Sequence, residues 1–159
     1  MSEPLHIPFE RFAHADDLPE DERSLLARAL EATDDAYVPY SQFQVGCALL
    51  LEDGEVMTGN NQENVAYPSG LCAERTALYY CGSQGKAKRI RKIAIRARSE
   101  RVPIDRPVTP CGACRQAMLE YERMAEADFV VLMQGATGEI LRVTGIAKTL
   151  LPFSFDIEF

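Results

Sequence analysis

Residues 71–98 read LCAERTALYYCGSQGKAKRIRKIAIRAR, and this stretch has the pattern of a helix followed by a strand. Residues 72–81 are expected to form the helix, and Gly82 ends it as a C-terminal glycine commonly does. In residues 92–98, apolar side chains alternate with charged or small ones, which predicts a strand with one buried face. A helix and a strand in direct succession are typical of a layered α/β protein.

The patterns on both sides extend this unit. The other predicted elements are a helix over 20–37, strands over 43–51 and 55–59 joined by a turn, a helix over 112–125, strands over 128–133 and 139–143, and a short helix capped by Thr144 and running to Leu150. Interspersed helices and strands, with a hairpin first, predict an α/β fold around a five-stranded mixed sheet. Residues 1–18 show little periodicity and are expected to be an N-terminal arm, with residues 19–159 as one domain.

The composition excludes several classes of protein. A formal charge of −7 argues against a protein that coats nucleic acid, because neutralising phosphates needs a basic surface. No apolar run approaches the ~20 residues that span a bilayer. The first residues, MSEPLHIPFERF, lack the pattern of a signal peptide. We therefore expect a cytoplasmic protein without a membrane or nucleic-acid partner.

The basic residues are unevenly distributed. Residues 86–101 hold eight of the 17 lysines and arginines. We expect this cluster to be a solvated helix end and strand edge. A subunit contact or an anionic partner is the alternative.

Five cysteines indicate metal or catalytic chemistry, because their number is odd and the chain has no secretion signal. Cys111 and Cys114 lie three residues apart at a predicted helix start, and Cys72 lies at another. If the two helices are neighbours, their positive N-terminal ends favour three thiolates at one place. Soft thiolates in a tetrahedral arrangement favour zinc, although a lone C-x-x-C motif also occurs in redox proteins.

The fourth position of such a site would be open. His6 and His14 lie in the arm, and Cys47 and Cys81 are expected to be small buried side chains. Three protein ligands are typical of a catalytic zinc, whose remaining position holds water. The sequence alone leaves three roles for Glu74: a fourth ligand, a helix-start carboxylate, or a carrier of protons from that water. Arg75 could donate hydrogen bonds to the thiolates or form a surface ion pair.

Four motifs together resemble the cytidine deaminase family, in its small three-cysteine type that acts on free nucleosides. They are AYVPYSQFQVGCALL (36–50), GNNQENVAYPSGLCAERTAL (59–78), VTPCGACRQAM (108–118) and LLPFSF (150–155). The pair CAE and PCGAC is the cysteine form of the deaminase signature H-x-E…P-C-x-x-C. The first ~20 residues lie outside the resemblance.

The resemblance implies a three-layer α/β/α sandwich and one zinc ion per chain on Cys72, Cys111 and Cys114. It implies that Glu74 shuttles protons while water replaces the amino group at C4 of cytidine or deoxycytidine, releasing ammonia in pyrimidine salvage. For the base, it implies contacts from Phe43 to the pyrimidine ring and from the main-chain amide of Ala73 to the pyrimidine carbonyl. For the sugar, it implies that Asn61 and Glu63 hold the ribose hydroxyls. Two further substrate-site residues are implied: Tyr67, which lies near subunit contacts, and Phe155, which covers the site.

The resemblance also implies a homotetramer whose sites are shared between subunits. Phe155 would then cover a neighbour's site, and the apolar end LLPFSFDIEF would be buried at an interface. Phe153 is an extra aromatic relative to the family pattern, so the residue that covers the base stays open.

Other functions use the same residues differently. A deaminase of a modified cytidine or a cytosine-bearing antibiotic would share the CAE and PCGAC motifs. A structural zinc module would keep the thiols but would not depend on Glu74. A redox protein would cycle Cys111 and Cys114 between thiol and disulfide without a metal.

Overall fold

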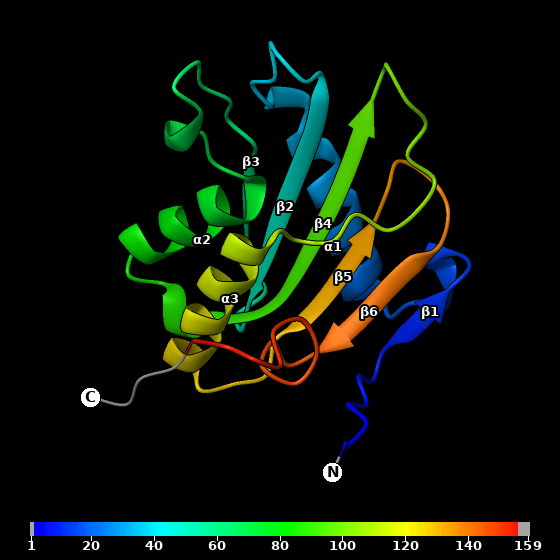
Figure 1. Ribbon diagram of the computed structural model, residues 1–159, viewed down its shortest axis with the longest axis vertical. Coiled ribbons are helices and arrows are strands. Elements are labelled where there is room, and N and C mark those ends of the chain that lie inside the picture. Colours follow the sequence, from blue (N-terminus) through cyan, green and yellow to red (C-terminus); the bar gives the residue numbers. More distant parts are fainter. Residues whose placement is uncertain (1, 156–159) are drawn as a thin grey trace.

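The computed structural model describes residues 2–155, and its centre is a six-stranded sheet of order β1-β6-β5-β4-β2-β3 (Figure 1). The elements are β1 (Glu10–Phe12), η1 (Ala15–Asp17), α1 (Glu20–Glu31), η2 (Ala32–Asp35), β2 (Phe43–Leu51), β3 (Val56–Asn60), η3 (Tyr67–Ser69), α2 (Ala73–Ser83), η4 (Ala87–Arg89), β4 (Ile90–Ser99), α3 (Gly112–Ala125), β5 (Val130–Gln134) and β6 (Ile140–Thr144). Strands β4 and β5 are parallel and the other neighbours are antiparallel. The mixed sheet expected from the sequence is confirmed.

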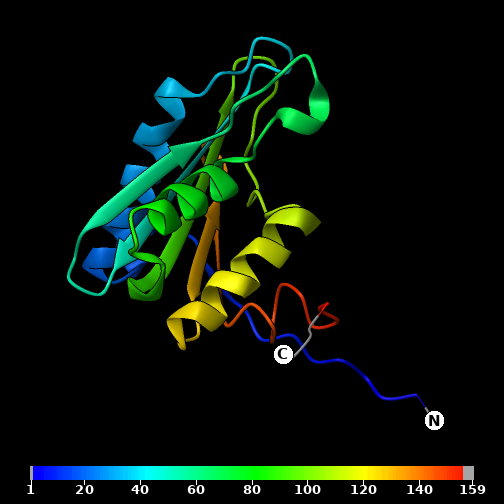
Figure 2. The ribbon, with the colours of Figure 1, turned by 90° about the vertical axis from the view of Figure 1, so that its left-hand side faces the viewer.

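The helices make three layers with the sheet. Helix α1 lies on one face, and α2 and α3 lie on the other (Figure 2). Successive residues of a strand point to opposite faces, so Ala94 packs in the α1 layer while Ile93 and Ile95 pack in the α2/α3 layer. Both layers consist of buried apolar side chains. Their packing holds α2 and α3 in fixed positions on the sheet.

A glycine brings α2 close to β3. A Cβ atom on Gly59 would lie 2.5 Å from the backbone nitrogen of Ala77 and 2.9 Å from its Cα. No side chain fits into that space, so the backbones of β3 and α2 approach more closely than larger residues allow. This contact fixes the helix whose start carries Cys72 and Glu74.

The sixth strand comes from the segment expected to be an arm. Glu10–Phe12 pairs with β6 in the register Glu10↔Arg142, Arg11↔Leu141 and Phe12↔Ile140. Ion pairs reinforce this edge, because Arg142 binds both Glu10 and Glu22, and Glu22 is 1% exposed. The five-stranded count expected from the sequence is therefore wrong by one strand.

Three predicted helices differ from the structure. Gly82 does not end the second one, because α2 includes it and runs to Ser83. The first ends at Glu31 and continues as the 3₁₀ turn η2. The short helix expected from Thr144 to Leu150 is wrong, because Thr144 belongs to β6 and pairs with Val130. Gly145 follows with φ +79°, and a single turn closes from Ile146 to Leu150.

Lys86, Arg89, Arg91, Lys92 and Arg98 of the basic cluster pair with acids of neighbouring elements. The pairs are Lys86–Glu55, Arg89–Asp53, Arg91–Glu52, Lys92–Asp21, Lys92–Glu22 and Arg98–Asp34. Most of these charges are partly exposed, as expected for a solvated surface. β4 lies between β2 and β5, so the expected strand edge is wrong.

Candidate active site

The three predicted thiols meet where α2 and α3 begin. Cys72 directly precedes α2, Cys111 directly precedes α3, and Cys114 lies in the first turn of α3. Their sulfurs all lie within 4.8 Å of one another. Cys72 Sγ lies 3.8 Å from Cys111 Sγ, which lies 3.4 Å from Cys114 Sγ. Cys47 and Cys81 are fully buried outside this cluster, as expected.

This donor set fits zinc. Zinc–sulfur bonds of about 2.3 Å in tetrahedral geometry place sulfurs about 3.8 Å apart. The separations of 3.8 and 3.4 Å are close to that value. Two helix N-termini also favour negative charge at this point. His6 and His14 are both exposed and distant in sequence, and the cluster found among the described residues contains only the three thiols.

Hydrogen bonds favour the thiolate form of Cys72. The interaction with Cys114, helped by Arg75 and Cys111 and opposed by burial, lowers the pKa of Cys72 to about 5. The same interaction with Cys72, together with burial, raises the pKa of Cys114. Arg75 Nη2 donates to Cys72 Sγ at 3.7 Å, and this contact raises the pKa of the guanidinium. Arg75 therefore contacts a thiol from the wall of the cluster, and its side chain is partly buried.

Glu74 is a buried carboxyl beside the thiols. It lies in the first turn of α2 and is 4% exposed. Burial is the main cause that raises its pKa, and the neighbouring Cys72 thiolate adds to it. A raised pKa brings acceptance and donation of a proton closer in energy than in an ordinary carboxyl, which suits a general acid and base.

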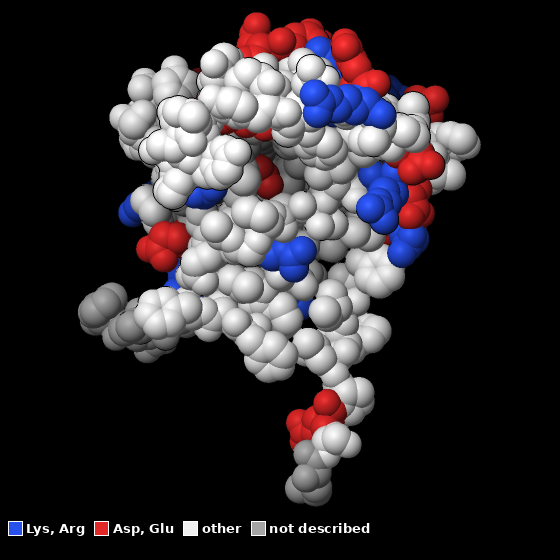
Figure 3. All heavy atoms as spheres, turned by 45° about the horizontal axis from the view of Figure 1, so that its top comes forward, with Lys and Arg blue, Asp and Glu red and all other residues white. Residues whose placement is uncertain are grey.

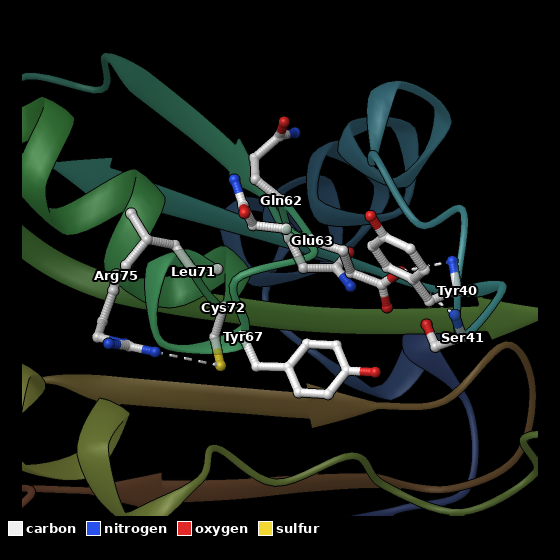
Figure 4. A pocket seen from close by; sticks show the side chains of 11 residues that line it. Tyr40, Ser41, Gln62, Glu63, Tyr67, Leu71, Cys72 and Arg75 are labelled. Atoms are coloured by element: carbon white, nitrogen blue, oxygen red, sulfur yellow. Dashed lines mark hydrogen bonds between the residues drawn. The ribbon is translucent and has the colours of Figure 1, made fainter.

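A pocket of about 490 Å³ opens beside Cys72. It is lined by Tyr40, Ser41, Asn61, Gln62, Glu63, Asn64, Tyr67, Gly70, Leu71, Cys72 and Arg75. Figure 3 shows the surface hollowed at this end of the molecule, with acidic atoms inside the hollow. In Figure 4, Cys72 and Arg75 lie at one side of the pocket and Glu63 at the other, with Tyr67 between them.

Glu63 is fixed by the loop that faces it. Its Oε2 accepts hydrogen bonds from the backbone N–H groups of Tyr40 at 2.9 Å and Ser41 at 3.2 Å (Figure 4). Partial burial acts to raise the pKa of Glu63, but bonds from Ser41 and Tyr40 outweigh it, and the net pKa is lowered. Both backbone bonds end on Oε2, so Oε1 remains to accept from a ligand.

Asn61 continues the β-ladder with its side chain. Its Oδ1 accepts from Val45 N at 2.8 Å, and its Nδ2 donates to Phe43 O at 2.9 Å. An amide nitrogen carries two hydrogens, so one N–H can still point to a ligand. Asn61 and Glu63 therefore present one donor and one acceptor in the same pocket.

The remaining predicted residues lie at different depths. Ala73 is fully buried at the start of α2, and Phe43 is half-buried at the start of β2. Tyr67 lines the pocket mouth and is 80% exposed. Phe155 is 73% exposed and is not among the pocket residues of this chain, and Phe153 is 87% exposed. The expected burial of LLPFSFDIEF rests partly on residues 156–159, which lie outside the described residues.

Sequence reasoning missed two groups of residues. Tyr40 and Ser41 orient Glu63 through their backbone amides, which no side-chain pattern reveals. Arg115 follows Cys114 and holds the carbonyl of Pro110, directly before Cys111, with a bond of 2.9 Å. Its position directly after Cys114 was the signal that the sequence offered.

Comparisons with known proteins agree with this geometry. The family model described as the cytidine and deoxycytidylate deaminase zinc-binding region matches residues 19–131. A cytidine deaminase of Halalkalibacterium halodurans is 44% identical over 138 residues, which cover 87% of this chain and 96% of the relative. A cytidine deaminase of Sporosarcina psychrophila is 41% identical over 138 residues, which cover 87% of this chain and 93% of the relative. Among solved structures, a cytidine deaminase of Burkholderia pseudomallei is 35% identical with a TM-score of 0.72, with 83% of this chain and 97% of that chain covered.

Proposed function

This chain belongs to the cytidine and deoxycytidylate deaminase family, and we propose that it hydrolyses the free nucleosides cytidine and deoxycytidine to uridine and deoxyuridine. One observation carries the proposal: three thiols within 4.8 Å of one another lie beside the buried Glu74, at the edge of a pocket that contains Asn61 and Glu63. A metal site, a proton carrier and a polar sugar site are thus adjacent. Pyrimidine salvage is the process that such a reaction serves.

Cys72, Cys111 and Cys114 would hold one zinc ion per chain. When bound, zinc supplies a Lewis acid that lowers the pKa of a water molecule. Arg75 partly neutralises the thiolates through its bond to Cys72 Sγ, which limits how much negative charge they donate.

Glu74 would move the protons of the reaction. It accepts a proton from the water that adds to C4 of the cytosine ring and delivers it to N3. It then takes the proton of the hydroxyl now on C4 and gives it to the amino nitrogen, so the C4–N bond breaks, ammonia leaves and the C4 carbonyl forms. Its burial suits both steps, because a raised pKa brings proton acceptance and donation close in energy. A role as fourth ligand would fill the position that water needs.

Asn61 and Glu63 would bind the hydroxyl groups of the sugar. A free amide N–H and a carboxylate oxygen match a hydroxyl that both accepts and donates. Among the pocket residues, Arg75 carries the cationic side chain and bonds to Cys72. The pocket therefore favours a neutral nucleoside over a 5′-phosphorylated one.

The base would be held by Phe43 against the ring and by the main-chain amide of Ala73 on the pyrimidine carbonyl. The highly exposed Tyr67 and Phe155 suit a homotetramer in which these side chains meet a neighbouring subunit. In this proposal, residues 19–159 form the catalytic domain and residues 1–18 are an appended arm that adds β1 to its sheet.

A panel of cytosine compounds tests the proposal. We expect turnover of cytidine and deoxycytidine with release of ammonia, and little or none of cytidine 5′-monophosphate. Metal analysis of the same sample should give about one zinc per chain. Turnover of the monophosphate in preference to the nucleosides would contradict the assigned pocket.

A further inference from the structure

Arg115 holds the peptide groups on both sides of Cys111. Its Nε donates to Pro110 O at 2.9 Å, and its backbone N–H donates to Cys111 O at 2.9 Å. These two carbonyls belong to the peptide planes directly before and directly after the Cα atom of Cys111. One residue therefore restrains both planes that set the backbone conformation of this cysteine.

Cys111 needs such a restraint more than Cys114 does. Cys114 is fully buried within α3, where the helical ladder fixes its backbone. Cys111 is exposed and precedes the helix, with an extended backbone at φ −67° and ψ 166°. The Pro110 carbonyl belongs to the peptide that joins Pro110 to Cys111, so the bond from Arg115 Nε restrains the plane that leads into Cys111.

The same guanidinium reaches the C-terminal segment. Its Nη1 donates to Leu150 O at 3.0 Å. Glu122, also on α3, accepts from Ile146 N at 2.9 Å, and Gln116 Nε2 donates to Phe155 O at 3.1 Å. Three residues of α3 thus bond to the segment that follows β6. Of these three, Arg115 also bonds to Pro110, directly before Cys111.

We propose that Arg115 is a positioning residue for the metal site: it orients Cys111 by holding the Pro110 carbonyl against the C-terminal segment at Leu150. The inference rests on the proposed function in that Cys72, Cys111 and Cys114 bind the metal. Arginine suits this task because its planar fork donates in two fixed directions. A lysine at this position keeps the charge but cannot hold both carbonyls in the same geometry.

A purely structural arginine behaves differently. It satisfies two carbonyls and supports the fold, and its loss lowers the stability of the metal-free protein without changing the affinity for the metal. A positioning residue affects the affinity and the coordination geometry. Groups that orient metal ligands typically change affinity by roughly 10- to 100-fold.

Cobalt(II) binding to the metal-free protein separates the two roles. Cobalt thiolates absorb visible and near-ultraviolet light, and the visible bands report the coordination geometry without any measurement of activity. The variants are Arg115→Lys and Arg115→Gln. The matched control is Arg28→Lys, an exposed arginine of α1 that pairs with Glu31 on the opposite face of the sheet.

We expect the wild type and Arg28→Lys to bind cobalt equally with a tetrahedral spectrum. Both Arg115 variants should bind it roughly 10- to 100-fold more weakly, with altered visible bands, while their metal-free far-ultraviolet circular dichroism stays native. Wild-type affinity and spectrum in both variants would overturn the inference. Unfolding of both metal-free variants would also overturn it, since Arg115 would then determine the fold. Failure of the wild type to bind cobalt would refute the proposed metal site itself.

Discussion

Replacing Glu63 with glutamine removes one interaction at the sugar site and keeps the others. The carboxylate accepts two backbone N–H groups on Oε2, from Tyr40 at 2.9 Å and Ser41 at 3.2 Å. A glutamine carbonyl oxygen can occupy the same position and keep both bonds. The other oxygen then becomes an amide nitrogen, which cannot accept a hydrogen bond from a sugar hydroxyl.

The size of the effect follows from that single lost bond. A hydrogen bond to a charged group contributes about 1.5–3 kcal/mol. At about 1.4 kcal/mol per factor of ten, KM for cytidine should rise roughly 10- to 150-fold. The sugar does not take part in the chemical step, so the bond stabilises the substrate and the transition state alike and kcat should be nearly unchanged.

Steady-state kinetics with cytidine measure both constants. Glu52→Gln is the matched control, because Glu52 is an exposed glutamate at the β2–β3 turn that pairs with Arg91. This control should keep both constants of the wild type. An unchanged KM in Glu63→Gln, or a fall in kcat alone, would refute the assignment of Glu63 to the sugar.

The pH dependence of KM tests the same carboxylate. Burial opposes the shift, but bonds from Ser41 and Tyr40 lower the pKa of Glu63 below its ordinary value. The ionised form is therefore favoured in the folded protein, and binding weakens only as pH falls through the lowered pKa. Glu74 and the thiols titrate in the wild type and in Glu63→Gln alike, so the ratio of the two KM values isolates Glu63 and should stay constant down to about pH 4.3, the ordinary glutamate pKa. A ratio that falls toward one well above this pH would contradict the geometry.

Two further predictions concern the scaffold. Glu22→Gln should lower the free energy of unfolding by about 2–3 kcal/mol, near the low end for a broken buried ion pair. The loss is limited because Lys92 and Arg142 are partly exposed and keep other acidic partners. Urea unfolding that matches the wild type would contradict this prediction. Gly59→Ala places a Cβ 2.5 Å from the backbone nitrogen of Ala77 and should cost about 1–3 kcal/mol while lowering kcat/KM through displacement of α2. Unfolding and kinetics that are both unchanged would show that β3 and α2 can separate without consequence.

Local patterns predicted most of the fold. Alternation and helical spacing predicted the mixed sheet and the main helices, because each of these segments has one clearly apolar face. β1 was missed because a three-residue strand has no measurable period and is held by ion pairs such as Glu10–Arg142. The turn after Thr144 was mistaken for a helix because a capping residue is also a good strand residue, and its pairing with Val130 is a tertiary contact.

The candidate site was predictable where side chains carry the chemistry. The C-x-x-C spacing pairs Cys111 with Cys114, and two predicted helix starts add Cys72 if the helices are neighbours; the structure brings the three sulfurs within 4.8 Å of one another. The backbone groups of Tyr40 and Ser41 that orient Glu63 carry no sequence signal, since every residue type other than proline has an N–H. Contacts made through the backbone can be found only from coordinates.

The most direct test of the metal-dependent deaminase site compares the wild type with Glu74→Gln. Glutamine keeps the size of the side chain in its buried position but cannot carry protons. We expect about one zinc per chain and the same unfolding temperature in both proteins. Cytidine turnover should fall by roughly 10²–10⁴-fold in the variant, as is usual when a general acid and base is lost. A zinc-loaded Glu74→Gln protein that deaminates cytidine at the wild-type rate would contradict the account.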